Sequence, residues 1–299
     1  MGSEMCIRDS RYTKYFSIDG FLYNSCNAKY IDATLYVSES DDNQIIYAFG
    51  TSGSGFKKTS SNFTTARNAS TGTSAFGGYT GATYPIEIAG DVGTVTTTTS
   101  QSGTTTTRAW SLKHTFYLFD SSGISSSVTD LDWVYPKAAY TTVGGSHNDI
   151  SVILLKSDTE GGKATSNWND LVGFTSGWGA GDVTEYSSEY VVDGYEETSI
   201  SYFFGNNIGS YVSETIPLNS DAKSNLEDDD TFKFGVVDYD QYYSNSFDNS
   251  YGASSSGRRY FVGSQIDDPV SANRPYLEYT TGTSEETVVH NANFFGTNF

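Results

Sequence analysis

The sequence predicts an all-β protein, a jelly-roll β-sandwich of two antiparallel sheets with one or two short helices. Its 299 residues include 23 Tyr and 18 Phe but only 5 Pro, and aromatic and β-branched residues suit the pleated surface of a sheet. Apolar residues recur with a period of two, which is the side-chain period of a strand. Clusters of Gly, Ser and Asn separate these runs at short intervals, a spacing typical of sandwiches and jelly rolls.

Strand-like runs follow one another along most of the chain. The run DATLYVS places Ala33, Leu35 and Val37 on one face. The strongest signal is DISVILLKS at residues 149–157, in which apolar residues are nearly continuous. Further strands are expected at residues 44–50, 114–120, 197–205, 210–218, 231–240, 258–264 and 274–282.

Two segments have helical spacing, residues 166–174 and residues 219–229. Both are short enough to be crossovers on a sandwich. The expected caps and inward-facing residues are Ser166 or Asn167 with Trp168 and Leu171 in the first, and Ser220 or Asp221 with Ala222 and Leu226 in the second.

A threonine tract, TVTTTTSQSGTTTT, occupies residues 94–107. It has two interpretations, a flexible loop or a hairpin that turns at Ser102-Gly103. Threonine is a good strand former and alternate residues of the tract can face opposite sides, so we favour the hairpin.

The two ends of the chain differ from the rest. Residues 1–10, MGSEMCIRDS, fit neither a strand nor a signal peptide and resemble a translated sequencing adapter, so we treat them as a non-native segment. Residues 11–282 are then a single sandwich, in which Cys26 is the only cysteine. Residues 283–299 form a Phe-rich tail that either docks on a neighbour or remains a flexible terminus.

The charge of the chain bears on its partners. The formal net charge is -19, and such a surface repels nucleic acid and anionic membranes. No apolar run reaches the roughly 20 residues that a membrane helix needs. We therefore expect no nucleic acid partner and no membrane insertion.

Motifs for catalysis are not found in the sequence. It contains no HExxH and no Walker-type loop, and its three histidines are far apart. His114 is interpreted as a packing or surface residue. Carboxylates abound, but no spacing selects a pair for glycoside hydrolysis. We expect a protein that is not an enzyme and that requires no cofactor.

Acidic residues around one strand suggest a structural calcium ion. Asp228, Asp229 and Asp230 precede the strand, and Asp238 and Asp240 follow it. Carboxylates and loop carbonyls are the ligands that Ca²⁺ prefers. The alternative is an exposed acidic turn, since no EF-hand spacing is present.

Aromatic residues interleaved with Asn and Asp suggest carbohydrate binding, because sugar faces stack on aromatic rings. The alternative is that these rings fill the core, an interpretation that we prefer for Trp168. Adjacent tyrosines on a strand would point to opposite faces, so one of Tyr242 and Tyr243 would be exposed. The candidate sugar-binding residues are Tyr239, Tyr242, Tyr243, Phe247, Tyr251 and Trp178.

Several segments together resemble one known family. These are residues 17–25, 108–137, 150–171 and 228–243 and the closing run RRYFVGSQIDDPVSANRPYLEYT at residues 258–280. They are similar to the DNRLRE-type jelly rolls, which resemble carbohydrate-binding modules and occur in bacterial surface proteins and phage virions. The resemblance implies a fold and brings no catalytic residues.

The closing run also has a physical interpretation. Pro275 cannot donate to a strand ladder, so it suits the start of a strand. We expect a central last strand near residues 116–120, with Leu277 buried and Glu278 exposed.

These observations predict a non-enzymatic structural or adhesive protein of a phage virion (tail, fibre or decoration) or of an extracellular appendage. Its partners would be neighbouring structural subunits or a cell-surface glycan. The alternative is a carbohydrate-binding module of a secreted surface protein, and a glycoside hydrolase or lyase comes third.

Overall fold

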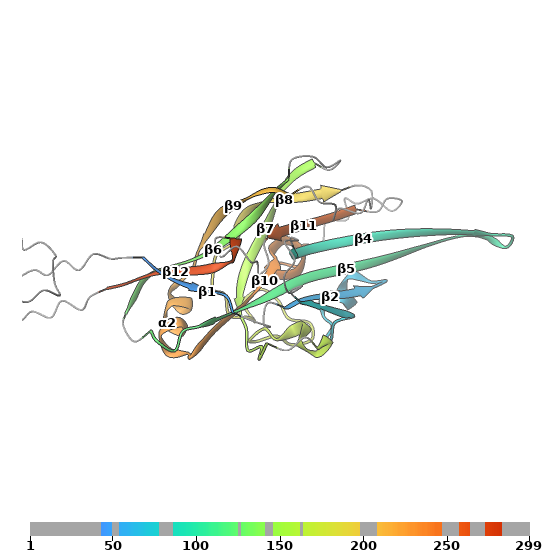
Figure 1. Cartoon of the computed structure of the whole chain (residues 1–299). Helices are drawn as coiled ribbons and strands as arrows, with labels where there is room; N and C mark the ends of the chain where they lie inside the picture. The colour runs from blue at the N-terminus through green and yellow to red at the C-terminus, as the bar shows by residue number, and fades with distance from the viewer. Residues whose placement is uncertain are drawn as a thin grey trace, which may run out of the picture.

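The computed structural model describes residues 43–49, 54–77, 86–124, 127–140, 146–161, 164–197, 208–246, 257–263 and 273–282. Within these ranges the chain is mostly antiparallel β-strand, with a few short helices (Figure 1). The strands are β1 (Gln44–Tyr47), β2 (Ser54–Ser60), β3 (Ser74–Gly77), β4 (Ile86–Ser100), β5 (Gly103–Asp120), β6 (Val128–Tyr140), β7 (Ser146–Lys156), β8 (Tyr190–Glu197), β9 (Ile208–Pro217), β10 (Thr231–Asp238), β11 (Gly257–Gly263) and β12 (Tyr276–Thr281). The helices are α1 (Phe63–Arg67), α2 (Ser220–Asp228), the 3-10 helix η2 (Thr165–Asn169) and the π-helical turn η3 (Tyr239–Tyr243).

The strands form two walls that face each other. One wall has the order β9-β6-β12-β1, and the other has the order β8-β7-β10-β5-β2-β3. The walls are linked into one twelve-stranded network, through the Ala48–Phe119 bridge between the β1 segment and β5 and through a Gly263–Lys137 pair between β11 and β6. The predicted all-β sandwich of antiparallel strands is therefore confirmed, with the addition that its two sheets are joined through β11 and through the residue that follows β1.

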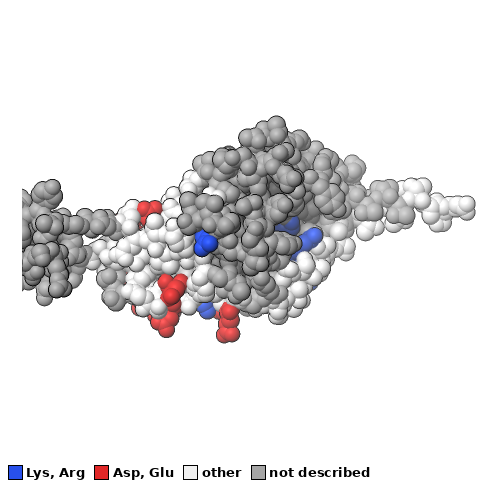
Figure 2. Space-filling view, in the orientation of Figure 1, with Lys and Arg blue, Asp and Glu red and all other residues white. Residues whose placement is uncertain are grey.

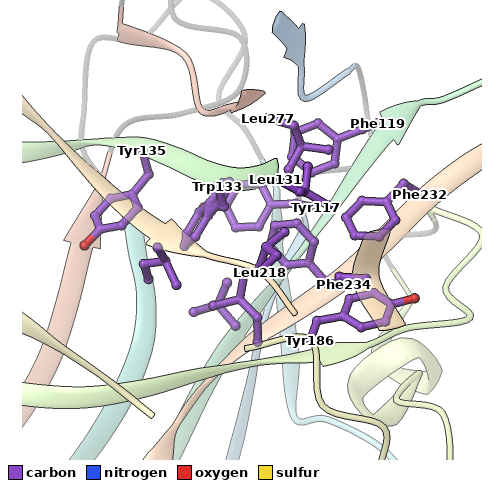
Figure 3. Close-up of a cluster of buried hydrophobic side chains, with 14 of the residues drawn as sticks. Tyr117, Phe119, Leu131, Trp133, Tyr135, Tyr186, Leu218, Phe232, Phe234 and Leu277 are labelled. Atoms are coloured by element: carbon purple, nitrogen blue, oxygen red, sulfur yellow. The ribbon is translucent and has the colours of Figure 1, made fainter. Parts of the chain in front are cut away.

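The first hydrophobic core lies between the two walls (Figure 3). Trp133 of β6 meets Phe234 of β10 with ring centroids 5.4 Å apart, and Tyr117 of β5 contacts both. Leu277 of β12 is fully buried there, and Ala222 and Leu226 of α2 close one end. Aromatic rings in such edge-to-face and tilted contacts add packing energy beyond their buried area.

A second core covers the opposite face of β5, β10 and β7. It contains Trp110 and Phe116 of β5 and Val237 of β10, under a layer made of α1, η2, η3 and the segment from Leu171 to Val183. Strand β7 contributes Val152 and Leu154 to the first core and Ile153 and Leu155 to the second. Strands β5, β7 and β10 are thus covered on both faces, which explains why the apolar run of β7 does not alternate with polar residues.

Close packing of the second core is most evident at Gly235. A Cβ atom at this position would lie 2.8 Å from Cε1 of Phe116 and 3.0 Å from Cδ2 of Leu171. Contacts this short are not tolerated in a close-packed interior, so β10 needs glycine here.

The sequence-predicted elements are largely present where they can be compared. Residues 219–229 form α2, but Asn219 is the cap, one residue before the expected Ser220. Residues 166–174 overlap η2, which ends at Asn169, and Trp168 and Leu171 are buried as expected. The expected caps Ser166 and Asn167 were wrong, since both lie within η2 and Ala164 precedes it. In α2, Ala222 and Leu226 are buried as expected.

The last strand, β12, lies between β1 and β6 and begins directly after Pro275. Leu277 is buried and Glu278 is half-buried, accepting a hydrogen bond from Asn43. The predictions for residues 1–10, 32–38 and 283–299 and for Cys26 lie outside the described residues.

Candidate functional site

The predicted sugar-binding tyrosines follow β10 in the π-helical turn η3 and not in a continued strand. Asp238 ends β10, and its Oδ1 accepts a hydrogen bond of 2.7 Å from the backbone N–H of Gln241. Ser244 N–H then donates to the carbonyl of Tyr239 across 2.8 Å, five residues back. The side chains of Tyr242 and Tyr243 therefore do not alternate across a sheet.

Both tyrosines point into the second core. Tyr242 and Tyr243 are 2% and 5% exposed, and Trp178 is 1% exposed and packs against both rings. Tyr239 is half-buried and stacks on Tyr243 with centroids 5.3 Å apart. A sugar can stack only on a ring face that it can reach, so in this conformation Tyr239 alone of these four has an accessible part.

The remaining two predicted rings, Phe247 and Tyr251, lie outside the described residues. The interpretation of the aromatic residues as core is therefore the one that fits Trp178, Tyr242 and Tyr243. Trp168 is also fully buried, as expected.

Arg67 fixes this aromatic cluster in place. Its guanidinium donates to three backbone carbonyls, those of Tyr242 at 2.7 Å, Trp178 at 2.9 Å and Tyr243 at 3.1 Å. It also lies 4.2 Å from the centroid of the Trp178 ring. Burial lowers the pKa of Arg67 from its usual value, an effect that the neighbouring Tyr242 opposes. The guanidinium remains charged despite its burial. Its planar set of N–H donors joins η3 to the loop that carries Trp178.

Sequence reasoning missed Arg67. The only local signal is the cap of α1, in which Asn62 accepts a hydrogen bond from Thr65 N–H. The carbonyls that Arg67 binds are more than 100 residues away along the chain, and nothing in the neighbouring sequence indicates them.

His114 lies beneath the same cluster and is fully buried. Its ring stacks on Trp168 at 3.9 Å, and its Nε2–H donates to the carbonyl of Trp168. Burial lowers the pKa of His114 to about 3, and the hydrogen bond to the carbonyl opposes this shift only in part. The imidazole is therefore neutral near pH 7, far from the pKa that suits a general acid or base at that pH.

Two phenol groups of the cluster donate hydrogen bonds. The Tyr242 hydroxyl donates to Oδ1 of Asn169 at 2.8 Å, and the Tyr243 hydroxyl donates to Glu185. Burial raises the pKa of Tyr242 and also raises the pKa of Tyr243 to about 12, with the Glu185 carboxylate adding to the second shift. Both phenols therefore stay protonated near pH 7 and do not act as nucleophiles there. Their hydrogen bonds to Asn169 and Glu185 help to hold η3 in place.

The predicted calcium ligands fall into two groups. Asp228, Asp229 and Asp230 are exposed where α2 meets β10, whereas Asp238 and Asp240 lie at the other end of β10. Asp238 is buried and caps η3. The five residues are therefore not brought to one place, and the described part of the chain has no cluster of three His, Cys, Asp or Glu side chains that could hold a metal ion.

A different feature stands out from the body of the protein. Strands β4 and β5 continue beyond the sandwich as a two-stranded ribbon, which we call the arm and define as residues 94–109 (Figure 1). Pairing within the arm runs without interruption from Thr94–Ala109 to Ser100–Gly103, so Gln101 and Ser102 form a two-residue turn. The predicted hairpin is thus present, with its turn one residue earlier than expected.

The described side chains of the arm are exposed, apart from half-buried Ala109 at its base. Residues 99–105 and Thr107 all lie in solvent, and at the tip Figure 2 shows neither acidic nor basic groups. On the outer edges, the pairing of β4 with β11 ends at Gly93 and that of β5 with β2 ends at Trp110. No described strand accompanies the arm beyond those residues.

No family model matches the chain, and no curated protein matches it. In the described ranges, no helix combines the length and the apolar character that crossing a bilayer requires.

Proposed function

We propose that the protein is a non-enzymatic structural or adhesive subunit, in which the sandwich is a rigid body and the arm is the element that engages a neighbouring molecule. The observation that carries the proposal is the arm itself. An isolated two-stranded hairpin is marginally stable in water, and exposed strand edges invite pairing. An extended ribbon whose side chains at residues 99–105 are exposed to solvent is best explained by a partner.

The packing of the body supports this role. Aromatic side chains fill both cores, and Arg67 locks the turn that carries Tyr242 and Tyr243. The part of the sheet formed by β5, β7 and β10 is covered on both faces. It resists deformation, because close-packed interiors have low compressibility. Such a body suits a subunit that must keep its shape while mechanical force acts on the arm.

The resemblance to DNRLRE-type jelly rolls suggests where such a subunit works, in a phage virion or an extracellular appendage. The carbohydrate-binding alternative now depends on Tyr239 and on the residues outside the described ranges, Phe247 and Tyr251. A glycan array with the full chain and with Tyr239→Ala tests it, and reproducible binding lost in that variant would favour the module. Turnover on a polysaccharide panel would favour a hydrolase or lyase instead.

The direct test of the proposal is to shorten the arm. Residues 95–108 are replaced by Asn-Gly, which joins Thr94 to Ala109 through a two-residue turn that suits this pair. We expect the thermal unfolding midpoint to stay within a few degrees, because the arm lies outside both cores. Association with other copies, or with the products of the genes that flank its own, should be lost in co-purification. A shortened variant that matches the full chain in all these assays would overturn the proposal.

A further inference from the structure

We infer that the arm pairs with the arm of a second copy, through the edge of β4 that no described strand pairs with, in antiparallel register about a two-fold axis. The inference rests on the proposed function and goes further, since it names the partner and the edge.

The geometry of the turn determines which backbone groups face outward. In a two-residue hairpin the flanking pair, here Ser100 and Gly103, exchanges both backbone hydrogen bonds, and such pairs then alternate along the ribbon. The N–H and C=O groups of Val95, Thr97 and Thr99 therefore point away from β5. They form a regular row of donors and acceptors that a further antiparallel strand can satisfy.

The two edges of the arm differ in how well they are protected. Natural proteins guard an edge strand with charged residues, Pro, bulges or a cover. Residues 94–100 of β4, TVTTTTS, contain no charged residue, no Pro and no Gly, and their pairing with β5 has no bulge. The β5 edge, GTTTTRA at residues 103–109, carries Arg108 and begins with Gly103. Residues 94–100 of β4 thus have the higher strand propensity and the weaker protection against pairing with another strand.

Symmetry favours a second copy as the partner. Two identical strands that meet edge to edge about a two-fold axis are necessarily antiparallel, which is the arrangement that the outward groups of β4 can satisfy. The result is a four-stranded sheet with β5, whose sequence includes a charged residue at position 108, on both outer edges, and a charge in an edge strand disfavours further growth. A closed pair follows, rather than an open fibre.

Charge explains why the contact lies on an arm. A net charge of -19 on each copy opposes direct contact between bodies. The arm from Thr94 to Ser100 is about 20 Å long at roughly 3.4 Å per residue, whereas the Debye length is about 8 Å at physiological ionic strength. Overlapping arms hold the two bodies at opposite ends of the ribbon, where their repulsion is largely screened. An uncharged β4 edge also carries nothing that would steer a charged partner of another kind.

The test uses two matched proline substitutions in the full chain. Thr97 and Thr106 face each other across the hairpin in a pair without mutual hydrogen bonds. Thr97→Pro removes an outward N–H from β4, and Thr106→Pro removes one from β5, at a similar cost to the hairpin. Sedimentation velocity over a concentration series should show a dimer for the unmodified chain. Thr97→Pro should raise its dissociation constant about ten-fold or more, and Thr106→Pro should leave it within about three-fold.

A second pair keeps the test valid if proline disturbs the hairpin. Thr97→Lys and Thr106→Lys retain every backbone donor and add the charge that guards natural edges. The lysine on β4 should weaken the dimer and the lysine on β5 should not, with circular dichroism unchanged in both. A chain that stays monomeric at every concentration, or a dimer that resists both Thr97 variants, would overturn the inference. If the chain is monomeric alone but loses a flanking-gene partner when the arm is shortened, the proposed function stands and the self-pairing does not.

Discussion

Strand β5 belongs to two regions with opposite properties. From Trp110 to Phe119 its side chains, apart from half-buried Lys113, are buried in the sandwich, where neighbours cover the sheet on both faces. From Gly103 to Thr105, and at Thr107, its side chains are exposed, and threonine replaces the large aromatics. The change takes place within a few residues around Arg108.

This difference separates two ways in which a strand can be stabilised. The body stabilises its strands through buried apolar area, at roughly 25 cal/mol per Å². The arm has backbone pairing, a few side-chain hydrogen bonds near its tip and the strand preference of threonine, which together leave a hairpin marginal. A single strand thus joins a region stabilised by two hydrophobic cores to the arm, for which we propose a partner.

The largest expected effect comes from removing an aromatic ring of the body. Phe234→Ala should lower the free energy of unfolding by about 3–5 kcal/mol, because Phe234 packs against Tyr117, Phe119 and Trp133. Thr105→Ala on the arm, an exposed control, should change it by less than about 0.5 kcal/mol. Urea unfolding of both variants measures the contrast, and equal effects would contradict the division into two regions.

Acid should weaken the body through His114. Its pKa is about 3 in the folded protein and near the ordinary 6.5 when unfolded, so the unfolded state binds the extra proton between these values. The stability is fully present above about pH 6.5 and is lost as the pH falls toward 3, by an amount on the order of 4 kcal/mol.

His114→Phe tests this effect because it keeps a ring against Trp168 and removes the titrating group. The variant should lose less stability than the unmodified chain between pH 7 and pH 4.5, in urea unfolding at each pH. Carboxylates contribute equally to both proteins. Parallel curves would show that His114 does not titrate on unfolding in this range.

A smaller effect is expected where one cation holds the aromatic turn. Arg67→Lys keeps the charge but not the planar fork, and a single ammonium cannot reach all three carbonyls that Arg67 binds. We expect a loss of about 1–3 kcal/mol in the free energy of unfolding. Fluorescence of Trp178, read in a variant lacking the other tryptophans, should shift to the red as water enters. A variant with unchanged stability would mean that the turn is held by its ring contacts alone.

The sequence predicted the elements whose causes are local. The nearly continuous apolar run at residues 149–157 predicted the strand β7, and the threonine tract has the alternation and Gly103 of a hairpin. The cap of α2 was misplaced by one residue because Asn219, Ser220 and Asp221 can all cap a helix.

The site was harder to predict because its causes are distant. Tyr242 and Tyr243 turn inward because the Asp238 cap ends β10 and Arg67, from a helix far along the chain, binds their carbonyls. The amino-acid composition around residue 240 is compatible both with exposed sugar-binding aromatics and with a buried aromatic turn. Only tertiary contacts distinguish the two.

Concentration-dependent hydrogen exchange tests the central claim most directly, because it reads the arm and the body in one experiment. Amides of the body, such as Val152 and Leu154, should exchange slowly at every protein concentration, since both lie in the first core. The outward amides of Val95, Thr97 and Thr99 should exchange quickly in dilute solution and become protected as concentration rises, while those of Thr104 and Thr106 stay fast. Free exchange of the β4 amides at all concentrations would contradict pairing between arms.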